Sequence, residues 1–165
     1  MTHDPAATLT GALAAALADP DPGAALSALD ALVQATVGAR LFTVMAFDAA
    51  TGISRRIWTN APETYPVGGE KPLPENDWTR QVIHDRRLWV ANTPAEVAAM
   101  LFDHETIAAL GCGAALNLPV VVADRVIGTL NLLDAAGHFT PERLAAAESL
   151  RLPGAAVLMR ASPWR

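Results

Sequence analysis

The sequence predicts an α+β domain organised around antiparallel pairs of strands. The strongest signal is a stretch in which two apolar runs, 114–122 and 126–133, flank the polar turn Ala123-Asp124-Arg125. Short β-branched runs on both sides of a polar turn are typical of a β-hairpin. A second hairpin is expected over 40–60, and apolar residues at helical spacing lie before the first hairpin and after the last.

Length, composition and charge narrow the class of protein. The 165 residues are expected to form one domain, 1–165, that is large enough for a real core. The chain is 52% hydrophobic, yet no apolar run reaches the ~20 residues that span a bilayer, and no signal peptide is recognisable. A net charge of −5 with scattered arginines argues against nucleic-acid binding. A single cysteine, Cys112, excludes a disulfide framework and a multi-cysteine zinc site. We expect a cytoplasmic protein and assign no metal ligand, and a haem or iron site held by a histidine or tyrosine stays open.

Two helices are expected in the N-terminal segment 1–37. Leucines recur at fourfold spacing over 6–18, and a second helix is expected over 24–36, with Gly38 as its C-terminal cap. The first strand pair then follows over 40–48 and 53–60. The residues of 53–60 that face the core are left open: they are either Ile53, Arg55, Ile57 and Thr59 or the alternate set that includes Trp58.

The segment that follows the first hairpin reads as an insert of loops and short helices. Residues 60–74 contain four prolines together with Tyr65 and Lys71, and a loop of this length is usually functional or disordered. Thr93 is expected to cap a helix whose first residue is Pro94. The remaining expected elements of the insert are a helix over 76–86, a short strand over 88–91, a helix over 95–101 and a helical turn over 103–110.

The central hairpin, 114–133, carries one asparagine in each of its apolar strands, Asn117 and Asn131. A buried amide without a partner costs roughly 1–3 kcal/mol, so each must find a hydrogen bond. The closing helix is expected from Thr140 to about residue 152, where Pro153-Gly154 interrupts it.

Several framework motifs together resemble the GAF domain family over roughly residues 24–152. They are Gly111-Cys-Gly-Ala at the start of a strand, Leu118-Pro-Val, Val126-Ile-Gly-Thr-Leu and Phe139-Thr-Pro-Glu. The resemblance implies a central antiparallel sheet of five to six strands within 40–134, with helices, including 140–160, on one face. It also implies a ligand pocket on the other face, covered by the insert 61–110.

The resemblance further implies a sensor or regulatory module that binds a small molecule and forms a homodimer through its terminal helices. This chain is expected to act without an attached output domain. It lacks the Asn-Lys signature of cyclic-nucleotide GAF domains, and Cys112 is followed by Gly113 rather than by the histidine of bilin-binding domains. The free methionine sulfoxide reductases, which are single GAF domains, use several cysteines. The sequence therefore names neither the ligand nor a cofactor.

The candidate ligand contacts are aromatic, amide and charged residues in the insert and on the neighbouring strands. Aromatic side chains with a polar tip suit ligand pockets, and Lys71 is suited to an anionic group. The competing interpretation is that the tryptophans belong to the core and that the asparagines bond to each other. The candidates are Trp58, Tyr65, Lys71, Trp78, Asp103, His104, Asn117 and Asn131.

Two other classes of function stay open. An enzyme on the same fold would use His104 with Asp103 or Glu105 as acid and base, or Cys112 as nucleophile. Against this, Asp103 also reads as a helix cap and Cys112 as a small buried hydrophobe. The third class is an interaction subunit whose pocket is filled by its own side chains.

Overall fold

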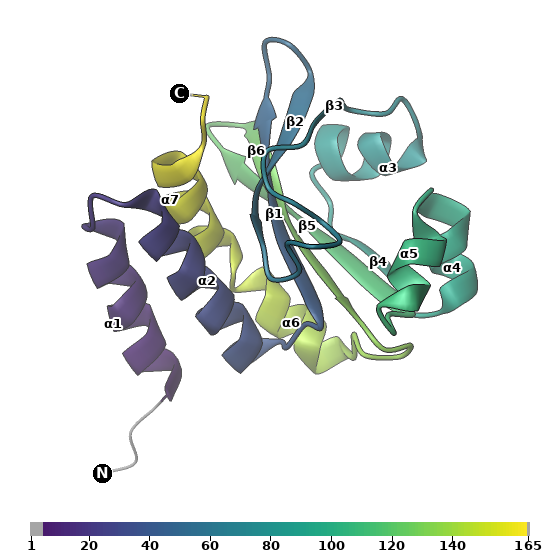
Figure 1. The fold of residues 1–165 in the computed structure, drawn as a ribbon, viewed down its shortest axis with the longest axis horizontal. Coiled ribbons are helices and arrows are strands. Elements are labelled where there is room, and N and C mark those ends of the chain that lie inside the picture. Colours follow the sequence, from purple (N-terminus) through teal and green to yellow (C-terminus); the bar gives the residue numbers. More distant parts are fainter. Residues whose placement is uncertain (1–4, 165) are drawn as a thin grey trace.

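A six-stranded antiparallel sheet forms the centre of the computed structural model, which describes residues 5–164 (Figure 1). The strand order is β3-β2-β1-β6-β5-β4, so the two hairpins meet through β1 and β6. The predicted α+β class and the predicted sheet of five to six strands are confirmed. The strands are β1 (Leu41–Asp48), β2 (Ile53–Thr59), β3 (Glu70–Pro72), β4 (Trp89–Ala91), β5 (Ala114–Val122) and β6 (Arg125–Asp134).

Helices from the N-terminal and C-terminal segments cover one face of the sheet, on the left in Figure 1. They are α1 (Pro5–Leu17), α2 (Pro22–Thr36), α6 (Pro141–Glu148) and α7 (Arg151–Ala161). The alternate strand residues Phe42, Val44 and Leu130 are fully buried against them. Gly38 has φ +75° and its N–H donates to the carbonyl of Val33 over 3.0 Å, which confirms the predicted cap.

The insert between β2 and β5 covers the other face. It contains α3 (Asp77–Thr79), the π-helix η1 (Arg80–His84), α4 (Pro94–Met100) and α5 (His104–Ala109). Thr93 caps α4 as predicted, and Glu96 completes a capping box. The predicted loop 60–74 contains β3, which pairs with the edge of β2, and the predicted helix 76–86 is an α-turn followed by a π-helix.

The strand β2 changes face along its length. Ser54 and Arg56 lie on the insert side, whereas Ile57 and Trp58 pack against the helix-covered core. A shift in the β1–β2 register between Val44 and Met45 causes this change, because a bulge interrupts the alternation of side chains. Neither of the two predicted alternating sets is therefore the buried one.

The C-terminal helices are separated at Ser149 and Leu150, not at Pro153-Gly154 as predicted. Pro153 is the third residue of α7, within the first turn, where a backbone N–H has no partner inside the helix. Gly154 packs on the sheet, and a Cβ there would lie 3.1 Å from Leu130 Cδ1. Within residues 5–164, no helix combines the length and the apolar character that crossing a membrane requires.

Candidate ligand-binding cavity

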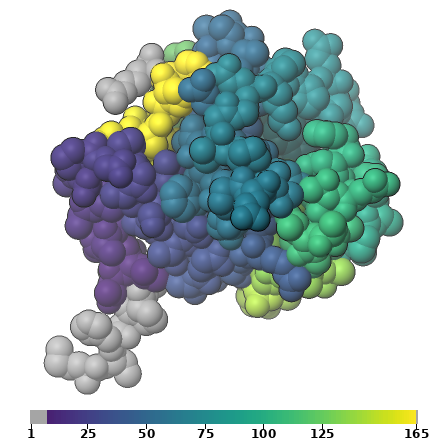
Figure 2. Space-filling model, viewed as in Figure 1, coloured from purple at the N-terminus to yellow at the C-terminus, as the bar shows by residue number. Residues whose placement is uncertain are grey.

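A cavity of about 590 Å³ lies between the sheet and the insert. Side chains of β1, β2, β5 and β6 form its floor, and the cover comes from the loop 61–76, α3 and residues 100–107. In Figure 2 the covering insert, coloured teal to green, occupies the centre and the right of the view, and the purple N-terminal helices lie on the left. The interpretation that the protein fills this space with its own side chains therefore does not apply.

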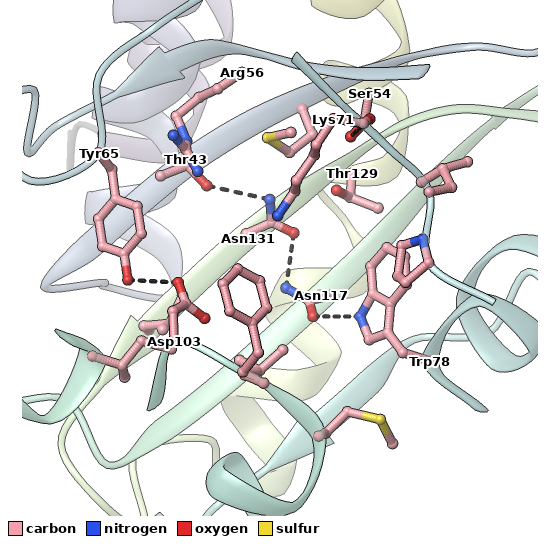
Figure 3. A pocket seen from close by; sticks show the side chains of 18 of the residues that line it. Thr43, Ser54, Arg56, Tyr65, Lys71, Trp78, Asp103, Asn117, Thr129 and Asn131 are labelled. Carbon is pink, nitrogen blue, oxygen red and sulfur yellow. Dashed lines mark hydrogen bonds between the residues drawn. The ribbon is translucent and has the colours of Figure 1, made fainter. Parts of the chain in front are cut away.

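A row of hydrogen bonds crosses the floor of the cavity (Figure 3). The register places Asn131 directly opposite both Thr43 and Asn117, so the three side chains line up across β1, β6 and β5. Trp78 Nε1 donates to Asn117 Oδ1 over 2.8 Å, Asn117 Nδ2 donates to Asn131 Oδ1 over 2.8 Å, and Asn131 Nδ2 donates to Thr43 Oγ1 over 3.2 Å. Both predicted asparagines thus find partners, and their row fixes the indole of the insert to the sheet.

A second polar group joins the loop 61–76 to the residue before α5. The Tyr65 hydroxyl donates to Asp103 Oδ2 over 2.8 Å, and the Arg56 guanidinium lies 5.0 Å from the centre of the Tyr65 ring. Asp103 makes no side-chain bond to the backbone of α5, so its carboxylate holds Tyr65 instead of capping the helix.

This second group is partly withdrawn from water, which changes two pKa values. Burial, reinforced by the hydrogen bond to Asp103, raises the pKa of the Tyr65 phenol. Burial lowers the pKa of Arg56, although the charges of Tyr65 and Asp103 oppose this effect. At neutral pH Tyr65 is therefore a neutral hydrogen-bond donor, and Arg56 keeps its positive charge because an arginine pKa starts far above 7.

Lys71, the single lysine of the sequence, lies on β3 at the edge of the cavity. Its Nζ atom is 5.2 Å from the centre of the Phe102 ring, and Phe102 is 84% exposed. Among the described residues no carboxylate forms an ion pair with Lys71. The cation–π contact connects β3 to the segment between α4 and α5 across the cavity.

Six of the eight candidate contacts line the cavity, and two do not. Trp58 lies on the opposite face of the sheet, where its Nε1 donates to Asp30 Oδ2 over 2.9 Å, because the bulge in the β1–β2 pairing turns it toward α2. His104 is the first residue of α5 and is absent from the cavity wall. The six that line the cavity are Tyr65, Lys71, Trp78, Asp103, Asn117 and Asn131.

The residues considered for catalysis are not brought together in the cavity. Cys112 is buried beside Ala115 and Leu133, and burial followed by the charge of Asp134 raises its pKa, while Arg40 opposes the rise. A thiol with a raised pKa is a poor nucleophile. Glu105 is exposed on α5. Over residues 5–164, no group of three or more His, Cys, Asp or Glu side chains is arranged to hold a metal ion.

Sequence reasoning missed four polar residues of the floor, namely Thr43, Ser54, Arg56 and Thr129. A signal for two of them exists, because Thr43 and Thr129 are the polar residues next to Asn131 on the same face of β1 and β6. Nothing in the sequence marks Arg56, since its direction depends on the bulge in the β1–β2 pairing.

Known proteins match this chain over most of its length. The family model described as GAF domain matches residues 23–157. The GAF domain of an Acinetobacter phosphoenolpyruvate-protein phosphotransferase superposes with a TM-score of 0.71 at 15% identity, over 98% of this chain and 96% of that chain. The corresponding GAF domain from Coxiella burnetii gives 0.69 at 17% identity, over 96% of both chains.

A chromophore-binding protein also shares this fold. The chromophore-binding domain of a bacteriophytochrome from R. palustris superposes with a TM-score of 0.63 at 13% identity, over 93% of this chain and 58% of that chain. At these identities the likeness concerns the fold alone. No curated protein sequence matches this chain.

Proposed function

This chain belongs to the GAF domain family, which is known for small-molecule sensing and regulation, and from that premise we propose that it binds a small organic molecule in the cavity beneath its insert. The observation that carries the proposal is the cavity of about 590 Å³, which lies within the range of ligand pockets. Its wall is largely apolar and includes a few fixed polar groups, the combination by which such pockets orient a ligand.

The hydrogen bonds across the floor support a regulatory role for the bound molecule. Trp78 belongs to the insert, whereas Asn117 and Asn131 belong to the sheet, so a ligand that contacts this row contacts both parts. Binding would then stabilise one position of the insert relative to the sheet. A ligand that prefers one arrangement shifts the population toward it, which is the physical basis of a sensor.

We test this proposal with two matched tryptophan substitutions after a ligand screen. Native mass spectrometry of the purified protein and a thermal-shift screen of metabolites identify binders, since a ligand at 100 times its Kd stabilises the fold by about 2.7 kcal/mol. Trp78→Phe and Trp58→Phe each remove one indole N–H bond, of 2.8 and 2.9 Å, but only Trp78 lines the cavity. We expect Trp78→Phe to weaken binding at least about tenfold and Trp58→Phe to leave it unchanged.

The proposal fails if the screen yields no binder and the native mass equals the denatured mass. It also fails if both substitutions weaken binding equally, because the ligand would then lie outside the cavity.

We further propose that the protein is a homodimer that associates through α1. This helix has no charged residue, and its outer positions Ala12, Ala14 and Ala15 are exposed. Uncharged, with only two polar side chains and with exposed alanines on its outer side, α1 offers a surface that a second copy can cover.

A further inference from the structure

We propose that the cavity selects an organic monocarboxylate, whose carboxylate binds near Thr43, Arg56 and Lys71 and whose apolar body lies against Met45 and Leu73. This inference rests on the proposed function, because it names the chemical class of the molecule bound in the same cavity.

The direction of the hydrogen bonds across the floor leaves a donor at one end. An indole N–H can only donate, so Asn117 Oδ1 must accept from Trp78 and the Asn117 amide nitrogen must donate onward. Asn131 in turn accepts through Oδ1 and donates through Nδ2, so Thr43 Oγ1 is the acceptor of the last bond in the row. The proton of the Thr43 hydroxyl then has no acceptor among the described residues, and the hydroxyl lines the cavity.

Two cations that form no ion pair with a described carboxylate line the same cavity. Arg56 lies opposite Met45, the next residue after Thr43 that faces the cavity, and Figure 3 shows both Arg56 and Thr43 among the side chains that line it. The Nη1 atom of Arg56 donates to the carbonyl of Pro66 over 3.1 Å, whereas its Nε atom is buried without a hydrogen-bond partner within residues 5–164. No described carboxylate forms an ion pair with Arg56 or Lys71. The Thr43 hydroxyl and the Arg56 Nε–H group therefore both lack an acceptor among the described residues. A carboxylate accepts two parallel N–H bonds from an arginine.

The charge balance of the cavity wall favours one negative charge over two. The wall carries two basic side chains, Arg56 and Lys71, and one acidic side chain, Asp103, which is a formal excess of one positive charge. A monocarboxylate neutralises that excess. A phosphate ester carries about −1.5 to −2 at pH 7 and would leave a negative charge uncompensated, which is costly in a partly buried site.

The rest of the cavity suits an apolar body. Met45 and Phe47 are buried there, and Leu73 and Trp78 pack against them. These side chains line the cavity on the side of the first hairpin turn. A ligand with a carboxylate at one end and an aromatic or aliphatic group at the other therefore matches the hydrogen-bond donors of the cavity with its first end and the apolar wall with its second.

Three probes of similar shape test this inference by calorimetry and by shifts of backbone amide resonances. They are 3-phenylpropionate, 3-phenylpropionamide and 2-phenylethyl phosphate. We expect the carboxylate to bind at least about tenfold more tightly than the amide and the phosphate. Arg56→Gln should remove this preference, and Lys71→Met and Thr43→Val should reduce it. Arg55→Gln is the matched control, because Arg55 is the neighbouring residue of β2, is absent from the cavity wall and forms an ion pair with Glu70.

Equal binding of the amide or of the phosphate overturns this inference and leaves the proposed function standing. A carboxylate preference that persists in Arg56→Gln, or is lost equally in Arg55→Gln, overturns it as well. If none of the three probes binds, the inference is wrong, while the proposed function is judged separately by the native mass and by the metabolite screen.

Discussion

The phenol of Tyr65, the single tyrosine of the sequence, lies where burial and a carboxylate both oppose its ionisation. The same hydrogen bond keeps the loop 61–76 against the residue that precedes α5. One side chain thus joins two separate segments of the insert. The phenol can donate this hydrogen bond only while it is protonated.

Because the pKa of Tyr65 is raised in the folded state, the folded protein retains a proton that the unfolded chain releases above about pH 10. The stabilisation by Tyr65 is therefore complete below pH 10 and is lost as the pH rises toward the folded-state pKa. The loss is at most ~1.4 kcal/mol per pH unit. Urea unfolding at pH 8 and pH 11 should show a smaller alkaline loss in Tyr65→Phe than in the wild type. Tyrosinate absorbance reports the same ionisation directly, and a midpoint near pH 10 in the folded protein would contradict the prediction.

Elements that are set by local signals could be predicted, and those set by distant contacts could not. Thr93 and Gly38 mark helix ends because a cap depends on residues within one turn. The turn of the central hairpin, where Ala123 and Asp124 both have positive φ, lies within the expected polar turn. The strand β3 depends on its pairing with β2, so no local pattern indicates it. The π-helix η1 and the break before α7 are not predicted by the sequence either.

In the candidate site, too, the residues whose positions depend on nearby sequence could be predicted and the others could not. The two asparagines could be predicted as a pair because one hairpin sets their register. The sequence leaves the face of Trp58 open and does not mark Arg56, because a bulge against β1 decides the direction of both side chains. The structure places Trp58, a candidate contact, on the face opposite the cavity.

The hydrogen bond between Trp78 and Asn117 predicts that substitutions of these two residues have coupled effects on stability. The π-helix follows directly after α3, which carries Trp78, and the bond from Trp78 to Asn117 fixes both elements to β5. Each of Trp78→Phe and Asn117→Leu should destabilise the protein by about 1–3 kcal/mol, because each leaves a polar partner unpaired. The double substitution should destabilise it by less than the sum, with a coupling of about 0.5–3 kcal/mol. Urea unfolding of the four proteins measures this, and additive effects would show that the bond does not join the two elements.

At the scale of the whole molecule, the proposed homodimer predicts a mass in solution of twice 17.3 kDa. Light scattering after size-exclusion chromatography measures it. Ala15→Glu places a charge on the outer face of α1 and should give the monomer, because an unpaired charge is costly to bury in an interface. Ala49→Glu, in the exposed turn of the first hairpin, is the control and should leave the mass unchanged. A wild-type protein that elutes as a monomer would contradict the dimer.

The layers that cover the two faces of the sheet come from separate parts of the chain. The terminal segments form the helical layer, and one continuous insert between β2 and β5 forms the cover of the cavity. The parts of the insert outside β3 and β4 can therefore change in sequence or in length with little effect on the core on the other face of the sheet. A domain built in this way can keep its core while changes in one segment of the sequence alter which ligand it binds.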